Sequence, residues 1–149
     1  MPELTLASFE SGTDEFKTAN ATGGSVEQSS AFHTEGAQGL EVVAPSDGNW
    51  FGFTLPTAVD LSEFSALKVD LKTGGDGTPG ELAIQVGAEN SWCQGSLWTW
   101  INPSRTGTIK RSMSELACGA GANLDLTQVR AIWVFLKAGT FHIDNVRAE

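Results

Sequence analysis

The strongest constraint on the fold is a repeated alternation of apolar and polar side chains in short runs. Every second residue is apolar in residues 67–72 and again in residues 82–86. In residues 50–55 the Phe and Leu side chains fall on one face and Trp50 falls on the other. Successive side chains of a β-strand point to opposite faces, so this period of two predicts strands with one buried face.

Further short strands and almost no helix complete the predicted arrangement. The strands are expected at residues 6–9, 25–32, 39–43, 97–102, 107–112, 129–136 and 140–146. Turn formers separate them, as at residues 22–24 and 74–77, and only residues 61–64 and 113–116 suggest single helical turns. About ten short strands in one domain, residues 1–149, predict an all-β antiparallel sandwich or barrel rather than β–α–β units.

One predicted strand, residues 129–136, is apolar on both faces from Ile132 onward. Such a strand lies in the middle of a sheet and is covered on both sides. If Ile132 and Val134 face the core between the sheets, Trp133 and Phe135 must face outward. These two rings would then line a binding cleft or lie beneath a covering loop.

The charge balance narrows the range of partners. The chain carries 9 Lys and Arg against 18 Asp and Glu, a formal net charge of -9. This excess of acid argues against nucleic-acid binding and against docking on an anionic membrane surface, both of which need basic side chains. No apolar run approaches the roughly 20 residues of a membrane-spanning helix. We therefore expect neutral partners or cations.

The two cysteines, Cys93 and Cys118, lie 25 positions apart, and neither belongs to a CxxC pair or to a histidine spacing typical of zinc sites. We expect one disulfide between them, the alternative being two separate buried thiols. A composition typical of extracellular proteins favours the disulfide, and a secreted, extracellular protein is expected. The first residues, 1–5, have neither the basic nor the apolar region of a signal peptide.

Tryptophan is the most informative residue type in the chain. Five Trp, eight Phe and no Tyr are present, and three of the Trp lie within residues 92–100. In a strand, Trp98 and Trp100 share one face and stand about 7 Å apart. A flat strip of two indoles suits the weakly positive C–H faces of sugar rings, because the face of an aromatic ring is negative. The alternative is that these rings belong to the core, as a Trp in a β-sandwich often does.

Other side chains would complete a sugar-binding site around this pair. Trp92, Trp133 and Trp50 are further candidates for stacking on a ligand. The candidates for hydrogen bonds to sugar hydroxyls lie on the polar faces of predicted strands and are Lys68, Asp70 and Gln85. The phenylalanines expected in the core are Phe9, Phe51, Phe53, Phe64 and Phe141.

Three segments carry a resemblance to a known group of proteins: ASFESG at residues 7–12, HTEGAQGL at residues 33–40 and FHIDNV at residues 141–146. With them, the chain resembles the jelly-roll carbohydrate-binding modules that are appended to plant-cell-wall glycoside hydrolases. The resemblance implies a jelly-roll β-sandwich that binds a neutral hemicellulose, with mannan slightly ahead of xylan and β-glucan. It also implies a monomeric, non-catalytic module linked to a catalytic domain.

The resemblance further implies one structural calcium ion, held where the first strand, an early loop and the last strand meet. Glu10, Glu35 and Asp144 would supply carboxylates, and Gln38 would supply a backbone or side-chain oxygen. Calcium takes about six to eight oxygen ligands, and oxygen is what these positions offer. The alternative is that these residues are ordinary surface groups of an acidic protein.

The sequence shows no catalytic constellation, so we expect a protein that is not an enzyme. The motifs GxSxG and HExxH are absent, and both histidines, His33 and His142, lie in the segments assigned to the calcium region. Two other classes stay open. One is a small glycoside hydrolase or lyase, since the 18 acids could include a catalytic pair. The other is a structural, protein-adhesion sandwich.

Overall fold

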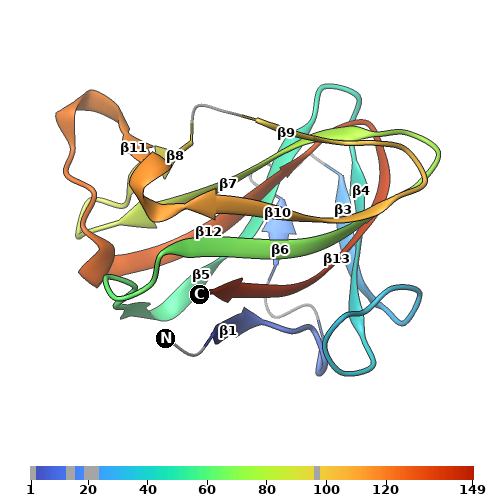
Figure 1. The fold of residues 1–149 in the computed structure, drawn as a ribbon, viewed down its shortest axis with the longest axis horizontal. Coiled ribbons are helices and arrows are strands. Elements are labelled where there is room, and N and C mark those ends of the chain that lie inside the picture. Colours follow the sequence, from blue (N-terminus) through green and yellow to red (C-terminus); the bar gives the residue numbers. More distant parts are fainter. Residues whose placement is uncertain (1–2, 13–15, 19–23, 96–97) are drawn as a thin grey trace.

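The computed structural model describes residues 3–12, 16–18, 24–95 and 98–149. Within these ranges the regular elements are strands and single turns of 3₁₀ helix, and no helix is long and apolar enough to cross a membrane (Figure 1). The strands are β1 (Leu4–Ala7), β2 (Lys17–Thr18), β3 (Ser25–Ser29), β4 (Gly39–Ala44), β5 (Asn49–Val59), β6 (Ala66–Thr73), β7 (Thr78–Val86), β8 (Ser91–Gln94), β9 (Thr99–Ile101), β10 (Thr106–Ser112), β11 (Ala117–Cys118), β12 (Val129–Leu136) and β13 (Gly139–Ala148). The 3₁₀ turns are η1 (Met113–Glu115), η2 (Gly119–Gly121) and η3 (Leu126–Gln128).

Two antiparallel sheets form a sandwich. The six-stranded sheet has the order β10-β6-β13-β4-β3, with β1 beside β13. The seven-stranded sheet has the order β11-β8-β7-β12-β5-β2, with β9 beside β7. Because β1 pairs with β13, the first and last strands lie side by side (Figure 1). The predicted all-β jelly-roll sandwich is confirmed.

The sheets enclose one apolar core, and the predicted alternation accounts for it. Along β6, β7 and β12 the inward residues are buried, as Leu71, Ile84 and Ile132 show. Four of the five phenylalanines predicted for the core are buried, and the fifth, Phe64, is partly buried and packs against it. The buried face also fixes the register, because a slip of one residue would turn every inward side chain toward solvent.

The structure adds strands that the alternation does not predict. β2 and β11 have two residues each, and β8 has the sequence SWCQ, which does not alternate. The described part of predicted strand 97–102 is β9 with one loop residue on each side, while residue 97 lies outside the described residues. The predicted turn at residues 113–116 contains η1, and residues 61–64 form a hydrogen-bonded turn.

The predicted disulfide joins Cys93 and Cys118. The two residues lie directly opposite each other on β8 and β11, with their Cα atoms 4.0 Å apart. The bond therefore fixes β11 to the edge of the seven-stranded sheet. It also closes the chain segment that contains β9 and β10.

A buried ion pair connects the two sheets where the edge of the seven-stranded sheet is interrupted. β7 pairs with β9 up to Gly80 and with β8 from Ala83 onward, so Glu81 lies between the two pairings. Arg111, on β10 of the six-stranded sheet, reaches this gap, and its Nε lies 2.6 Å from Glu81 Oε1. The side chains of Arg111 and Glu81 are 5% and 0% exposed, so the buried Glu81 charge depends on Arg111 for compensation. Arg111 also pairs with Glu115, whose Oε2 lies 3.1 Å from its Nη1.

Candidate functional site

Five aromatic side chains gather on the outer face of the seven-stranded sheet. We call Trp50, Trp92, Trp98, Trp133 and Phe135 the aromatic surface. They come from β5, β8, the residue before β9, and β12. Side chains alternate along β12, so burying the inward residues of this strand turns Trp133 and Phe135 outward, as the sequence predicts.

Ring contacts make this surface continuous. The Trp50 ring lies in its middle, with its centroid 4.9 Å from Trp92, 5.9 Å from Trp98 and 5.4 Å from Phe135. Trp92 lies 6.1 Å from Trp133, and Trp98 lies 4.9 Å from Phe135 at an interplanar angle of 85°. Edge-to-face contacts of this kind are favourable, so the rings hold one another in position.

Exposure differs sharply across the aromatic surface. Trp133 is only 7% exposed and packs on Ala83 and Ala131, while Trp50 and Trp92 are partly covered and lie against it. Gly52 pairs with Trp133, and a Cβ atom there would lie 2.8 Å from Cε3 of the indole, so glycine leaves room for the ring. Trp98 is 44% exposed. Trp133 is thus the most buried tryptophan of the aromatic surface, and the ring of Trp98 is exposed to solvent.

Two glutamines hold the indole N–H groups. Trp133 Nε1 donates to Gln85 Oε1 at 3.0 Å, and Trp92 Nε1 donates to Gln94 Oε1 at 2.8 Å. Gln85 Nε2 in turn donates to the Asn90 carbonyl. Gln85, predicted to bind sugar hydroxyls, therefore lies beneath the indoles and orients one of them. Gln94 is not among the predicted residues, although its position two residues after Trp92 in a strand places it on the same face.

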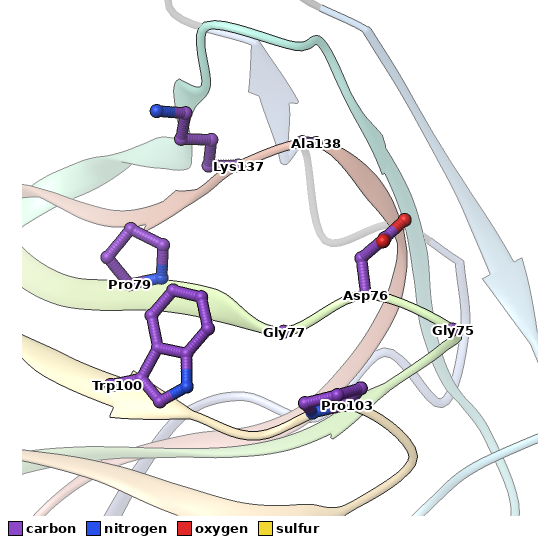
Figure 2. Close-up of a pocket in the computed structure, with 8 residues that line it drawn as sticks. All are labelled: Gly75, Asp76, Gly77, Pro79, Trp100, Pro103, Lys137 and Ala138. Atoms are coloured by element: carbon purple, nitrogen blue, oxygen red, sulfur yellow. The ribbon is translucent and has the colours of Figure 1, made fainter.

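Trp100 stands apart from the aromatic surface but on the same side of the sheet. On β9 it pairs with Pro79 of β7, and Pro79 shares a face with Ala83, on which Trp133 packs. Trp100 is 59% exposed, and its Nε1 donates to Asn102 Oδ1 at 3.0 Å. Its ring lines a pocket of about 470 Å³ (Figure 2), which we call the Trp100 pocket; the other lining residues are Gly75, Asp76, Gly77, Pro79, Pro103, Lys137 and Ala138.

Lys68 and Asp70 lie far from these rings in the fold, so their predicted place beside the tryptophans is wrong. Both are on β6, in the six-stranded sheet. Lys68 Nζ is 2.7 Å from Glu149 Oε2, and Asp70 Oδ1 is 3.1 Å from Arg147 Nη1. The alternation assigns each residue to a face of its strand. It does not say which sheet the strand joins.

The residues predicted to bind calcium meet beside the end of β1. The Glu10 carboxylate accepts hydrogen bonds from the backbone N–H groups of Ala37, at 2.7 Å, and Gln38, at 2.9 Å, and these bonds lower the pKa of Glu10. Gly36 has a φ of +66°, and a Cβ atom there would overlap the Glu10 carboxylate. Only glycine fits this approach of the loop to the acid. The contact of Gln38 with Glu10 is made by its backbone N–H, which donates to the carboxylate.

Two oxygens of this region are buried without a hydrogen-bond partner among the described residues: Glu35 Oε2 and Asp144 Oδ1. The other oxygen of Asp144 accepts from the N–H groups of Thr34, at 2.7 Å, and Glu35, at 2.9 Å. Burial, and to a lesser degree the charge of Glu10, raise the pKa of Asp144. We call Glu10, Glu35 and Asp144 the acidic cluster.

The acidic cluster fits a hard cation in the chemistry of its donors. Its unpartnered atoms are carboxylate oxygens, the ligands that calcium prefers, and a cation would offset the cost of burying them. Within the described part of the chain, no group of three or more His, Cys, Asp or Glu side chains is placed to hold a metal by itself. Backbone carbonyls and water would have to supply the remaining ligands.

No protein-family model and no curated protein matches this chain. Solved structures do match it. The family 11 carbohydrate-binding module from Clostridium thermocellum, in complex with a β-1,3-1,4-mixed-linked tetrasaccharide, is 21% identical over 98% of this chain and 94% of that chain, with a TM-score of 0.73. A family 28 module specific for non-crystalline cellulose is 17% identical over 96% and 92%, with a TM-score of 0.69.

A third structure extends the comparison. The xylan-binding family 22 domain from Paenibacillus barcinonensis is 10% identical over 96% of this chain and 90% of that chain, with a TM-score of 0.66. Nearly the whole chain is matched in each case, which makes the likeness one of complete domains. This chain has the β-sandwich fold of these carbohydrate-binding modules.

Proposed function

We propose that this chain is a non-catalytic carbohydrate-binding module that holds a neutral, β-linked polysaccharide against the aromatic surface. The observation that carries the proposal is the exposure of Trp98, 44%, on an outer sheet face. Trp50 and Phe135 contact this ring, so it is positioned before a ligand arrives. A sugar ring can then stack on it with little loss of side-chain freedom.

Charge and fold together select the polysaccharides worth testing. A net charge of -9 opposes acidic polymers. The structurally similar modules are described with a mixed-linked β-glucan fragment, with non-crystalline cellulose and with xylan. Mannan is supported by the sequence resemblance alone. The panel is therefore β-glucan, cellulose in soluble form, xylan and mannan.

Affinity electrophoresis in gels that contain each polysaccharide tests the proposal. We expect wild-type protein to be slowed in at least one gel. The variant Trp98→Ala should lose about 1–3 kcal/mol of binding free energy, by analogy with the stacking of other flat rings on aromatics. Val43→Ala removes an exposed apolar side chain, 41% exposed, from the six-stranded sheet and should bind as the wild type does. Wild-type mobility that no polysaccharide changes would overturn the proposal.

The two alternative classes give different results in the same experiments. A glycoside hydrolase needs two cooperating carboxylates beside the sugar. On the face that carries the aromatic surface, the carboxylate of β7 is Glu81, which is fully buried and paired with Arg111. Asp76 lines the Trp100 pocket, and no second carboxylate is among the described residues that line it. This supports a binding role, and release of reducing sugar from a polymer in the panel would contradict it. A protein-adhesion sandwich would bind none of the polymers.

The proposal includes one structural calcium ion at the acidic cluster. Glu35 and Asp144 would hold it through their unpartnered oxygens, with Glu10 and an oxygen of Gln38 beside them. A ligand that binds only the folded state adds about 2.7 kcal/mol of stability when its free concentration is 100 times its Kd. We expect Tm to fall in EDTA and to recover with Ca²⁺, and a Tm indifferent to EDTA would remove the ion from the proposal.

The proposal also places the module outside the cell, as a monomer linked to a glycoside hydrolase. The disulfide supports an oxidising compartment. Linkage would keep a catalytic domain close to its polymer by raising its effective concentration there. Light scattering on the purified chain would test the monomer.

A further inference from the structure

The Trp100 pocket is built from three separate loops at one end of the seven-stranded sheet. The β6–β7 connection supplies residues 75–77, the β9–β10 connection supplies Pro103, and the β12–β13 turn supplies Lys137 and Ala138. Figure 2 shows the Trp100 ring next to Pro79, with Pro103 to its right, Asp76 beyond Gly77 and Lys137 on the other side of Pro79. Rigid apolar groups thus form one wall of the pocket, and polar groups reach its rim.

Trp100 itself is prepared for stacking. Its ring is 59% exposed, more than any other large apolar side chain in the described part of the protein. The Asn102 amide oxygen accepts the indole N–H, which satisfies the polar edge of the ring and limits its rotation. The six-membered ring extends toward Pro79 (Figure 2).

Asp76 and Lys137 carry opposite charges at the rim of the pocket. Neither forms an ion pair with another described residue, although other charged side chains of the domain do, such as Lys68 with Glu149 and Arg147 with Asp70. The Asp76 carboxylate lies over Gly139, with Oδ2 3.7 Å from the position a Cβ atom would take there. One acceptor and one donor, held apart, match sugar hydroxyl groups, which both donate and accept.

The pocket continues the aromatic surface. Trp98 and Trp100 are two residues apart on the same side of the sheet, a separation of about 7 Å along an extended chain. A polymer that stacks on Trp98 and follows the edge of the sheet toward β9 therefore reaches Trp100 next. The aromatic surface alone would bind a short stretch of polymer, and the pocket would bind its continuation.

We propose that the Trp100 pocket is a second sugar subsite, in which one neutral sugar unit of the same polymer stacks on Trp100 while Asp76 and Lys137 bind its hydroxyl groups. This inference rests on the proposed function of the aromatic surface. The pocket makes affinity depend on chain length, since only an oligosaccharide long enough to occupy both places gains its contacts.

Titration calorimetry with oligosaccharides of two to six units, cut from whichever panel polymer slows the wild type, tests the subsite. Trp100→Ala should leave the affinity for the shortest bound oligosaccharide unchanged and weaken the affinity for the longest by about tenfold. Asp76→Ala and Lys137→Met should each weaken binding of the longest oligosaccharide severalfold. Trp98→Ala should weaken binding at every length, and Val43→Ala at none. Equal Tm values exclude unfolding as the cause.

The outcomes separate the two proposals. If the wild type binds no oligosaccharide or polymer, the function of the aromatic surface is wrong and the subsite falls with it. If Trp98→Ala weakens binding but Trp100→Ala binds the longest oligosaccharide like the wild type, the function stands and the subsite is overturned. If Trp100→Ala weakens all lengths equally, the pocket is part of a single short site, and the length dependence is wrong.

Discussion

The outer faces of the two sheets are made from strands with the same alternation, yet their chemistry is opposite. On the six-stranded sheet, Lys68 and Lys110 both pair with Glu149, and His142 Nε2 lies 3.2 Å from Glu41 Oε2. Glu149 compensates the charges of the two lysines, and exposed pairs of this kind contribute about 0–1 kcal/mol each. The outer face of the seven-stranded sheet instead leaves large rings partly uncovered. The buried faces explain the fold, and the difference between the outer faces points to function.

The largest expected effect comes from breaking the ion pair that joins the two sheets. Glu81→Ala removes the buried partner of Arg111 and leaves it only the partly exposed Glu115, which should lower the free energy of unfolding by about 3–5 kcal/mol. Urea denaturation measures this loss. The double variant Glu81→Met with Arg111→Met removes both charges and should recover much of it. A single variant as stable as the wild type would mean that the pair does not hold the sheets together.

Removing the disulfide should loosen the seven-stranded sheet and leave the six-stranded sheet unchanged. Changing Cys93 and Cys118 to Ser should lower the free energy of unfolding by about 3–4 kcal/mol, because the unfolded chain regains the freedom of a closed loop. Amide hydrogen exchange should accelerate on β8 and β11, beside Trp92, and stay slow on β4. Equal acceleration in both sheets would show that the bond stabilises the domain as a whole and gives the aromatic surface no special support.

The orientation of a single ring gives a smaller effect. Gln94→Leu removes the acceptor of the Trp92 indole N–H, and the ring loses one hydrogen bond worth about 0.5–1.5 kcal/mol. Binding to the selected polysaccharide should weaken by a similar amount, which affinity electrophoresis detects. Lys68→Ala, on the opposite sheet, is the matched control, and the polysaccharide should slow it as much as the wild type when each mobility is taken relative to a gel without polysaccharide. If the two variants behave alike, the orientation of Trp92 does not matter for the ligand.

The fold can be predicted from the sequence because the burial of one strand face produces a local pattern of apolar residues. Every second residue of β6 and β7 must be apolar, and that period shows in the chain itself. The disulfide was also accessible, since two cysteines allow one pairing. The short strands β2, β8 and β11 have no such apolar pattern, because their position depends on the strand beside them.

The candidate site can be predicted only in part from the sequence, because it depends on the order of the strands in the sheet. Trp98 and Trp100 are exposed on one side of the sheet as the alternation predicts, but the cluster around Trp98 is completed by β5 and β12, which are distant in sequence. The alternation does not give the order of the strands, so it predicts Lys68 and Asp70 beside the tryptophans, although β6 belongs to the other sheet. The Trp100 pocket is made by three loops, whose meeting no sequence period encodes.

The smallest expected effect tests the charged outer face through its pH dependence. Hydrogen bonds from Lys68, and then from Lys110, lower the pKa of Glu149 from 4.5, so the folded state holds this carboxylate ionised more strongly than the unfolded state does. The resulting stability is present above the ordinary pKa and is lost as the pH falls through the lowered one. Glu149→Gln should therefore have a slightly lower Tm than the wild type at neutral pH, and the difference should vanish in acid.

Glu63→Gln, an exposed acid without an ion pair among the described residues, should show no such pH-dependent difference. Relative to a gel without polysaccharide, the polysaccharide should slow both variants as much as the wild type, because neither residue lies on the seven-stranded sheet. Weaker slowing of Glu149→Gln would mean that the two outer faces are coupled through the core.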